Sequence, residues 1–151
     1  PFDRILEAVR DGEVDAGLII HEGQLTYAQE GLTRVVDLGQ WWHQETGLPL
    51  PLGGNVVRKD LGTELMKQAT RMLQDSIKYA LSHRKEALAY ALKYARGLKA
   101  EEADKFVGMY VNELTVDYGD NGRAAVRLLF ETAFAKGIID RKIQPEFIEL
   151  D

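Results

Sequence analysis

The sequence predicts an α/β fold, because a helical pattern at its start is followed by two strand-like apolar runs and then by several helical patterns. Over residues 2–9, apolar residues recur at three- and four-residue steps, which predicts a helix. Residues 14–20 form an almost unbroken apolar run with β-branched members, which favours a buried strand. Residues 33–38 form a second, shorter apolar run. This order of elements is typical of an α/β unit with a largely parallel sheet.

The middle of the chain is punctuated by glycine and proline and carries two adjacent tryptophans, Trp41 and Trp42. Adjacent residues cannot share one helix face, so we expect one tryptophan to pack inward and the other to lie near a rim. Prolines and then glycines in residues 48–54 predict a connector into a short strand at 55–58. Further along, apolar stripes predict helices over 61–81, 87–94, 106–114 and 124–134.

The composition is that of a globular protein with one domain, since 45% of its 151 residues are apolar. The absence of cysteine excludes disulfides, a thiolate zinc site and a cysteine nucleophile. A net charge of −5 with scattered lysines and arginines argues against a nucleic-acid partner. No apolar run reaches membrane-spanning length and no secretory signal is visible, so we expect a cytoplasmic protein with no membrane partner. Because the chain begins at Pro1, directly with a helical pattern, we expect it to be part of a longer protein.

Three histidines are candidates for proton transfer, and their contexts differ. His83 lies in a polar joint after a predicted helix, and His43 follows the tryptophan pair; both contexts are typical of surface or capping residues. His21 ends the run 14–20, and ligands of open α/β sheets collect outside the carboxyl ends of the strands. Histidine as a residue type exchanges protons near neutral pH, which suits a general base. We therefore single out His21, with a hydrogen-bonded residue at the edge of the core as the alternative.

The remaining polar motifs point to structure rather than chemistry. Glu22 follows His21, but neighbours on an extended chain point to opposite sides, so we expect no direct partnership unless the backbone turns at once. No spacing of histidine and carboxylate residues matches a metal site, so no metal is implied. Gly53 and Gly54 are not followed by the lysine of a phosphate-binding loop and favour a hinge or turn.

Several segments resemble one enzyme family. These are residues 12–22 (GEVDAGLIIHE), 46–53 (TGLPLPLG) and 58–62 (RKDLG), with weaker likeness at 110–112 (YVN). In them the sequence is similar to the 1,4-dihydroxy-6-naphthoate synthases of the futalosine route to menaquinone. The resemblance implies the two-lobed fold of type II periplasmic binding proteins, of which this chain would be the carboxyl-terminal part. It assigns residues 1–50 to the end of the second lobe, 51–60 to a connector or hinge strand, and 61–151 to helices that pack on a first lobe outside this chain.

The resemblance also implies an activity. Members of this family are lyases that convert cyclic dehypoxanthine futalosine to 1,4-dihydroxy-6-naphthoate, and the histidine matching His21 is the proposed base. The small-molecule substrate would meet a cleft floor or hinge that includes Leu50, Gly53, Gly54 and Asn55. Proton removal beside a carbonyl followed by aromatisation needs neither a redox cofactor nor a metal, so no cofactor is expected. Since the first lobe is missing, we expect the chain alone to be inactive.

Three other interpretations stay open. A chorismate dehydratase shares the lobes but should lack the His21 motif. A solute-binding protein would use His21 only to hydrogen-bond its ligand. A helical interaction module fused to a remnant of a sheet would explain the helices and leave the matches in residues 15–53 as coincidence.

Overall fold

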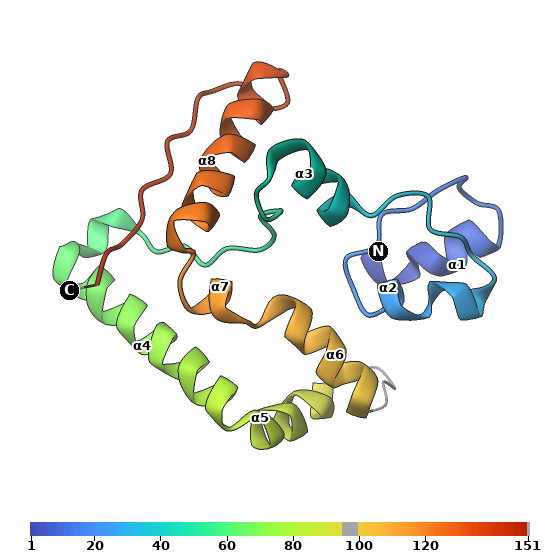
Figure 1. Cartoon of the computed structure of the whole chain (residues 1–151), viewed down its shortest axis with the longest axis horizontal. Coiled ribbons are helices and arrows are strands. Elements are labelled where there is room, and N and C mark those ends of the chain that lie inside the picture. Colours follow the sequence, from blue (N-terminus) through green and yellow to red (C-terminus); the bar gives the residue numbers. More distant parts are fainter. Residues whose placement is uncertain (95–99, 151) are drawn as a thin grey trace. The chain divides into compact units, whose positions relative to one another are not determined.

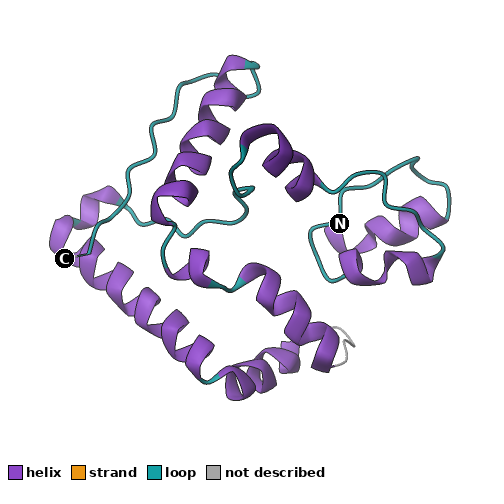
Figure 2. Ribbon diagram, in the orientation of Figure 1, coloured by secondary structure: helices purple, strands orange, loops and turns teal. Residues whose placement is uncertain are grey.

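The computed structural model describes residues 1–94 and 100–150, and every regular element in this part of the chain is a helix (Figures 1 and 2). The chain divides into two compact units. Unit 1 comprises Pro1–Asp37 and Arg84–Tyr110, and unit 2 comprises Leu38–His83 and Val111–Asp151. None of the described helices combines the length and the apolar character that a membrane crossing requires.

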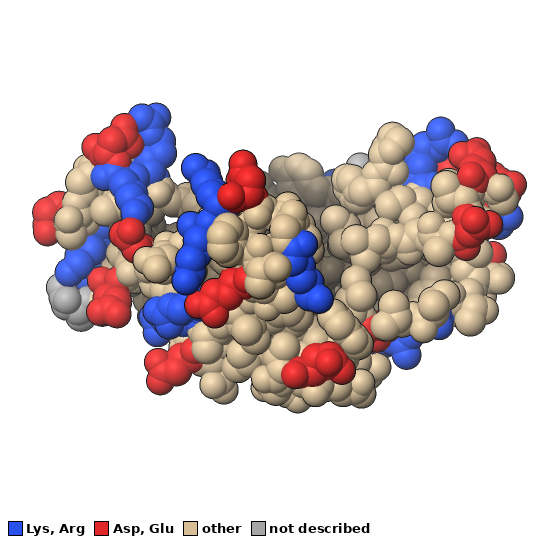
Figure 3. Space-filling view, turned by 90° about the horizontal axis from the view of Figure 1, so that it is seen from above, with Lys and Arg blue, Asp and Glu red and all other residues tan. Residues whose placement is uncertain are grey.

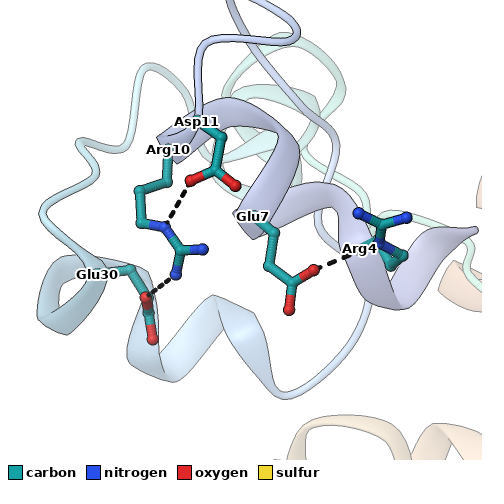
Figure 4. Close-up of polar contacts among 5 residues, drawn as sticks. All are labelled: Arg4, Glu7, Arg10, Asp11 and Glu30. Atoms are coloured by element: carbon teal, nitrogen blue, oxygen red, sulfur yellow. Dashed lines mark hydrogen bonds and ion pairs between the residues drawn. The ribbon is translucent and has the colours of Figure 1, made fainter.

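Unit 1 begins with the amphipathic helix that the sequence predicts. A short 3-10 turn leads into α1 (Ile5–Arg10), and Gly12, with φ of +74°, lies just beyond the helix end in the left-handed region that favours glycine. Arg10 at the end of α1 donates a hydrogen bond to Asp11 at 3.0 Å and another to Glu30 at 2.9 Å (Figure 4). Glu30 closes the second 3-10 helix, so Arg10 ties the two segments together. The elements of unit 1 are η1 (Phe2–Arg4), α1, α2 (Gly23–Thr26), η2 (Tyr27–Glu30), α5 (Arg84–Ala91), η4 (Leu92–Tyr94) and α6 (Ala100–Tyr110).

Helices α5 and α6 pack together through one bidentate contact. The guanidinium of Arg84 donates to the Asp104 carboxylate at 2.7 Å and to the Asp104 main-chain carbonyl at 2.9 Å. Ala103, next to this contact, is buried. Because a guanidinium with two fixed acceptors has little freedom, this pair sets the distance between the two helices.

Unit 2 contains the long helices predicted from the apolar stripes. The prediction over 61–81 is confirmed by α4 (Thr63–Ser82), and the prediction over 124–134 by α8 (Gly119–Ala135). The helix predicted over 106–114 is instead divided between α6, which ends at Tyr110, and α7 (Glu113–Val116). Asn112 caps α7, because its side chain accepts a hydrogen bond from the Leu114 amide at 3.0 Å. The remaining elements of unit 2 are α3 (Leu38–Thr46) and η3 (Lys59–Leu61).

The two tryptophans of α3 separate as predicted. Trp42 is buried with 6% of its surface exposed, whereas Trp41 is 49% exposed. The indole N–H of Trp42 donates to the carbonyl of Pro49 at 3.1 Å, and the Thr46 hydroxyl donates to the carbonyl of Trp42 at 2.7 Å. The chain after α3 therefore folds back onto Trp42.

The carboxyl-terminal segment of unit 2 is irregular but packed. The ring of Phe147 meets the ring of Tyr118 edge to face with centroids 5.9 Å apart. The guanidinium groups of Arg123 and Arg127 lie over the same ring at 5.8 and 5.2 Å from its centroid. This aromatic and cation–π cluster holds the segment against α8.

The three predicted strands are wrong for the described part of the chain. Residues 14–20, 33–37 and 55–58 are irregular, and most apolar residues in them are exposed, to 88% at Val35 and 97% at Val56. An apolar, β-branched run forms a strand only where neighbouring strands accept its backbone hydrogen bonds, and no described segment supplies such neighbours. The α/β class is thus absent from this structure. The predicted division at residues 50 and 60 stays a prediction, and residues 95–99 and 151 of the part 61–151 lie outside the described residues.

Candidate functional site

His21 lies in unit 1 at an abrupt backbone turn. The amide of Gln24 donates to the carbonyl of His21 at 3.0 Å, and the amide of Leu25 donates to the carbonyl of Glu22 at 2.9 Å. These bonds start α2, so the irregular run 14–20 ends in a helical turn and not in a continuing extended chain. The side chain of His21 is 11% exposed.

The two ring nitrogens of His21 differ in their surroundings. The amide of Gly23 donates to Nδ1 at 3.0 Å, while Nε2 is buried and has no hydrogen-bond partner among residues 1–94 and 100–150. An acceptor role for Nδ1 places the proton of the neutral ring on Nε2, an assignment that follows from the direction of the Gly23 bond. The Phe2 ring packs beside the imidazole with centroids 5.8 Å apart and planes tilted by 58°.

Gly23 is the residue that lets the ring take this position. A Cβ atom at Gly23 would lie 2.6 Å from Cε1 of His21 and 2.7 Å from Cδ1 of Leu6. Both distances are below the contact distance of carbon atoms, so any side chain at this position would displace the imidazole of His21 or the side chain of Leu6 on α1.

His21 lines a pocket of about 480 Å³ within unit 1. The lining residues with polar groups are His21, Asp3, Glu22 and Tyr94, and the apolar wall includes Leu92 and Phe106. One proton-exchanging ring and two carboxyl groups thus face a largely apolar space, an arrangement typical of small-molecule sites. The carboxylate Oε2 of Glu22 lies 3.9 Å from Nδ1 of His21.

Sequence reasoning missed Asp3 and Phe2 as neighbours of His21. Nothing in the spacing of Asp3 links it to His21. The expectation for Glu22 is corrected too: the backbone does turn at once, so adjacent side chains reach the same pocket.

The predicted substrate-binding residues lie in unit 2, on the irregular segment between α3 and η3. Leu50 is half-buried, and Gly53, Gly54 and Asn55 are exposed. A Cβ at Gly54 would lie 3.0 Å from the hydroxyl of Tyr118, so the backbone passes close to that side chain. The described residues that line the pocket around His21 all belong to unit 1, and the role of these four residues stays a prediction.

The other two histidines are exposed, as their sequence contexts predict. His43 lies on the surface of α3. His83 caps the end of α4, with its ring stacked on Tyr79 at 3.9 Å and its Nδ1 3.0 Å from the Tyr79 carbonyl.

Within residues 1–94 and 100–150, no group of three or more histidine and carboxylate residues gathers in a metal-binding arrangement. On the face drawn in Figure 3, acidic and basic side chains are interspersed, and neither sign forms a continuous area.

Residues 1–135 match a family model described as "Menaquinone biosynthesis". The chain belongs to this family. Two members of known function resemble it along most of its length, and both are 1,4-dihydroxy-6-naphthoate synthases. The protein from Thermus thermophilus is 46% identical over 147 residues, which cover 97% of this chain and 54% of that protein. The protein from Streptomyces coelicolor is 40% identical over 139 residues, which cover 92% of this chain and 49% of that protein.

The chain is also similar to a solved structure. A crystal structure of a protein from Archaeoglobus fulgidus is 50% identical, with a TM-score of 0.88, over 92% of this chain and 53% of that one. This menaquinone biosynthesis chain therefore spans about half the length of the relatives it matches.

Proposed function

We propose that the natural full-length protein carrying this sequence is a lyase that converts cyclic dehypoxanthine futalosine to 1,4-dihydroxy-6-naphthoate, with His21 as its general base. The observation that supports it most is the unpartnered Nε2 of His21 in a pocket with two carboxyl groups. The two synthases at 46% and 40% identity support the reaction class.

The proposed reaction requires little from the protein besides a positioned base. His21 would remove an acidic proton next to a carbonyl of the substrate, and the electron pair left behind would drive carbon–carbon cleavage and elimination. Aromatisation of the product then favours the forward direction. A positioned base contributes about 10²–10⁴-fold, and the apolar wall around His21 limits competing contact with water.

For the whole protein the proposal includes two lobes that close over the substrate. Residues 1–50 would end the second lobe, residues 51–60 would form the connector, and the helical part from residue 61 would pack on the first lobe. The segment with Leu50 and residues 53–55 would then form the floor or hinge of the cleft. Closure of such lobes brings reacting groups together and excludes water.

The test is replacement of His21 in the full-length protein. We expect His21→Asn to lower naphthoate formation by roughly 10²-fold or more, because the proton acceptor is lost. The matched controls are His43→Asn and His83→Asn, whose exposed side chains lie outside the pocket and whose loss should leave turnover within a few-fold. If His21→Asn also turns over within a few-fold of the parent, His21 is not the base.

A second test addresses the length of the chain. The purified 151-residue chain should form no naphthoate, because half of the length of its relatives is missing from it. Measurable turnover by this chain would contradict the two-lobe proposal.

One observation favours a second candidate function, that of a solute-binding protein. With Nδ1 accepting from Gly23, the resting ring offers an N–H donor at Nε2, which suits a hydrogen bond to a bound ligand. In that case His21→Asn would weaken substrate binding, and the unmodified full-length protein would bind the substrate without converting it.

A further inference from the structure

Nδ1 of His21 has two polar neighbours that demand opposite protonation states. The Gly23 amide, 3.0 Å away, is a donor and needs a lone pair on Nδ1. The Oε2 atom of Glu22, 3.9 Å away, is an acceptor and would bond only to a proton on Nδ1. The structure shows the first arrangement, in which Nε2 carries the proton of the neutral ring.

A general base that faces the pocket with Nε2 needs the second arrangement. Its Nε2 lone pair must be free, so the ring proton must sit on Nδ1. Once Nε2 has taken a proton from the substrate, both nitrogens carry protons, and an Nδ1–H group would then face the Gly23 N–H, donor against donor. An acceptor must take over at Nδ1 for His21 to work as a base.

We propose that Glu22 is that acceptor, a positioning residue that takes the Nδ1–H of His21 and so turns Nε2 into the base. This inference rests on the proposed function of His21. In this proposal Glu22 acts through the ring of His21.

Local backbone geometry makes the shift small. Because α2 begins directly after His21, Glu22 lines the same pocket as the ring, and its side chain is 30% exposed and able to change rotamer. A movement of Oε2 by about 1 Å, together with a rotation of the imidazole that takes Nδ1 out of line with the Gly23 N–H, would bring Oε2 from 3.9 Å to hydrogen-bond distance of Nδ1. Backbone bonds at Glu22 are unaffected, since its carbonyl is the group that accepts from Leu25.

Carboxyl groups are the charged neighbours of His21 in the pocket. Its charged lining residues besides His21 are Asp3 on η1 and Glu22, and its other titratable residue is the phenol of Tyr94 on η4. Two carboxylates beside an imidazole stabilise the imidazolium that proton removal creates. The Oε2 atom of Glu22 lies within 4 Å of a ring nitrogen.

The proton transfer from the substrate to His21 balances in protons and electrons without a co-reactant. The carbon–hydrogen bond of the substrate breaks, its proton goes to Nε2, and its electron pair stays on the substrate and is delocalised onto the neighbouring carbonyl. The proton on Nδ1 stays there, hydrogen-bonded to Glu22, whose carboxylate keeps its charge.

A substrate-free titration tests the pairing. In ¹⁵N-labelled full-length protein, NMR follows the protonation of both ring nitrogens of His21. We expect the titration curve of Glu22→Gln to lie at lower pH than that of the parent, because the amide keeps the size of the side chain and removes its charge. The matched control is Glu13→Gln, which removes the same charge from an exposed position of unit 1 outside the pocket.

Kinetics supply the second readout. We expect Glu22→Gln to lower kcat by on the order of 10- to 100-fold with little change in KM, a part of what a positioned base supplies. Glu22→Asp, which keeps the charge on a shorter arm, should recover part of the loss.

The two readouts separate the two proposals. If His21 titrates identically in the parent and in Glu22→Gln, the inference about Glu22 is wrong whatever the protein catalyses. If the titration shifts as expected but the unmodified protein forms no naphthoate, the pairing stands and the lyase function fails.

Discussion

The hydroxyl of Tyr110 donates a hydrogen bond of 3.1 Å to the carbonyl of Ile20, the residue directly before His21. The same hydroxyl accepts from the side-chain amide of Gln24 at 2.6 Å. Tyr110 is the last residue of α6 and lies 90 positions from Ile20 in the sequence. Its hydroxyl therefore brackets the turn, in the sense that it bonds to a residue before His21 and to a residue after it. We infer that α6 fixes the backbone from which the imidazole projects.

Removal of this hydroxyl should loosen the turn. Tyr110→Phe keeps the ring and deletes the groups that bind Ile20 and Gln24, so we expect a loss of about 1–3 kcal/mol in the free energy of unfolding from the two bonds together. Turnover in the full-length protein should fall several-fold, since a misplaced base is a weaker base. Denaturant unfolding and steady-state kinetics measure the two effects.

Tyr79→Phe is the matched control for that variant. Tyr79 is an exposed residue of α4, and its ring stacks on His83 with or without the hydroxyl. Its unfolding free energy should stay within about 0.5 kcal/mol of the parent. Equal effects of the two tyrosine variants would contradict a bracketing role for Tyr110.

Gly23 should tolerate no side chain. In Gly23→Ala the added Cβ would press on Cε1 of His21 at 2.6 Å and on Leu6 at 2.7 Å, so we expect a loss of about 1–3 kcal/mol of stability and a shifted His21 ring signal in NMR spectra. Gly53→Ala is the control, because a Cβ there would meet no atom within 4 Å and the backbone is not in the left-handed region. A stable Gly23→Ala protein with an unchanged His21 signal would refute the tight contact.

The helices could be predicted from the sequence because their hydrogen bonds are local. An apolar stripe every three or four residues was enough to locate α1, α4 and α8. The strands failed for the opposite reason: the runs around Val35 and Val56 have the composition of strands, but a sheet depends on partners that no local pattern supplies.

The same contrast between local and non-local interactions applies to the candidate site. His21 was found because its local context, the end of an apolar run, carries a signal. Tyr110 and Asp3 join it only through the tertiary structure, so their spacing from His21 carries no signal. Glu22 was set aside on the geometry of an extended chain, which α2 replaces with a helical turn.

The adjacent tryptophans of α3 offer an internal comparison. Trp42→Phe removes a buried indole and its hydrogen bond to Pro49, so we expect the free energy of unfolding to fall by about 1–3 kcal/mol. Trp41→Phe changes a half-exposed side chain and should cost about 0.5 kcal/mol or less. Denaturant titration of the two variants decides the matter, and an equal loss in both would show that the Trp42 contact is not specific.

Asp60 should make a small, acid-sensitive contribution to stability. The Arg58 guanidinium donates two hydrogen bonds to its carboxylate, one of them at 2.9 Å, and this lowers the pKa of Asp60 below its ordinary value of 3.8. A carboxyl group whose pKa is lower in the folded than in the unfolded chain stabilises the fold above the ordinary value, and the effect is lost as the pH falls through the folded-state value.

The comparison of Asp60→Asn with the parent isolates this contribution. At about pH 6 the parent should unfold at higher denaturant concentration than the variant, and the gap should close as the pH is lowered from about 4 toward 2. Both side chains are exposed, so added salt should narrow the gap at about pH 6. A gap that is the same at both pH values would mean that the Asn variant is destabilised through something other than the charge of Asp60.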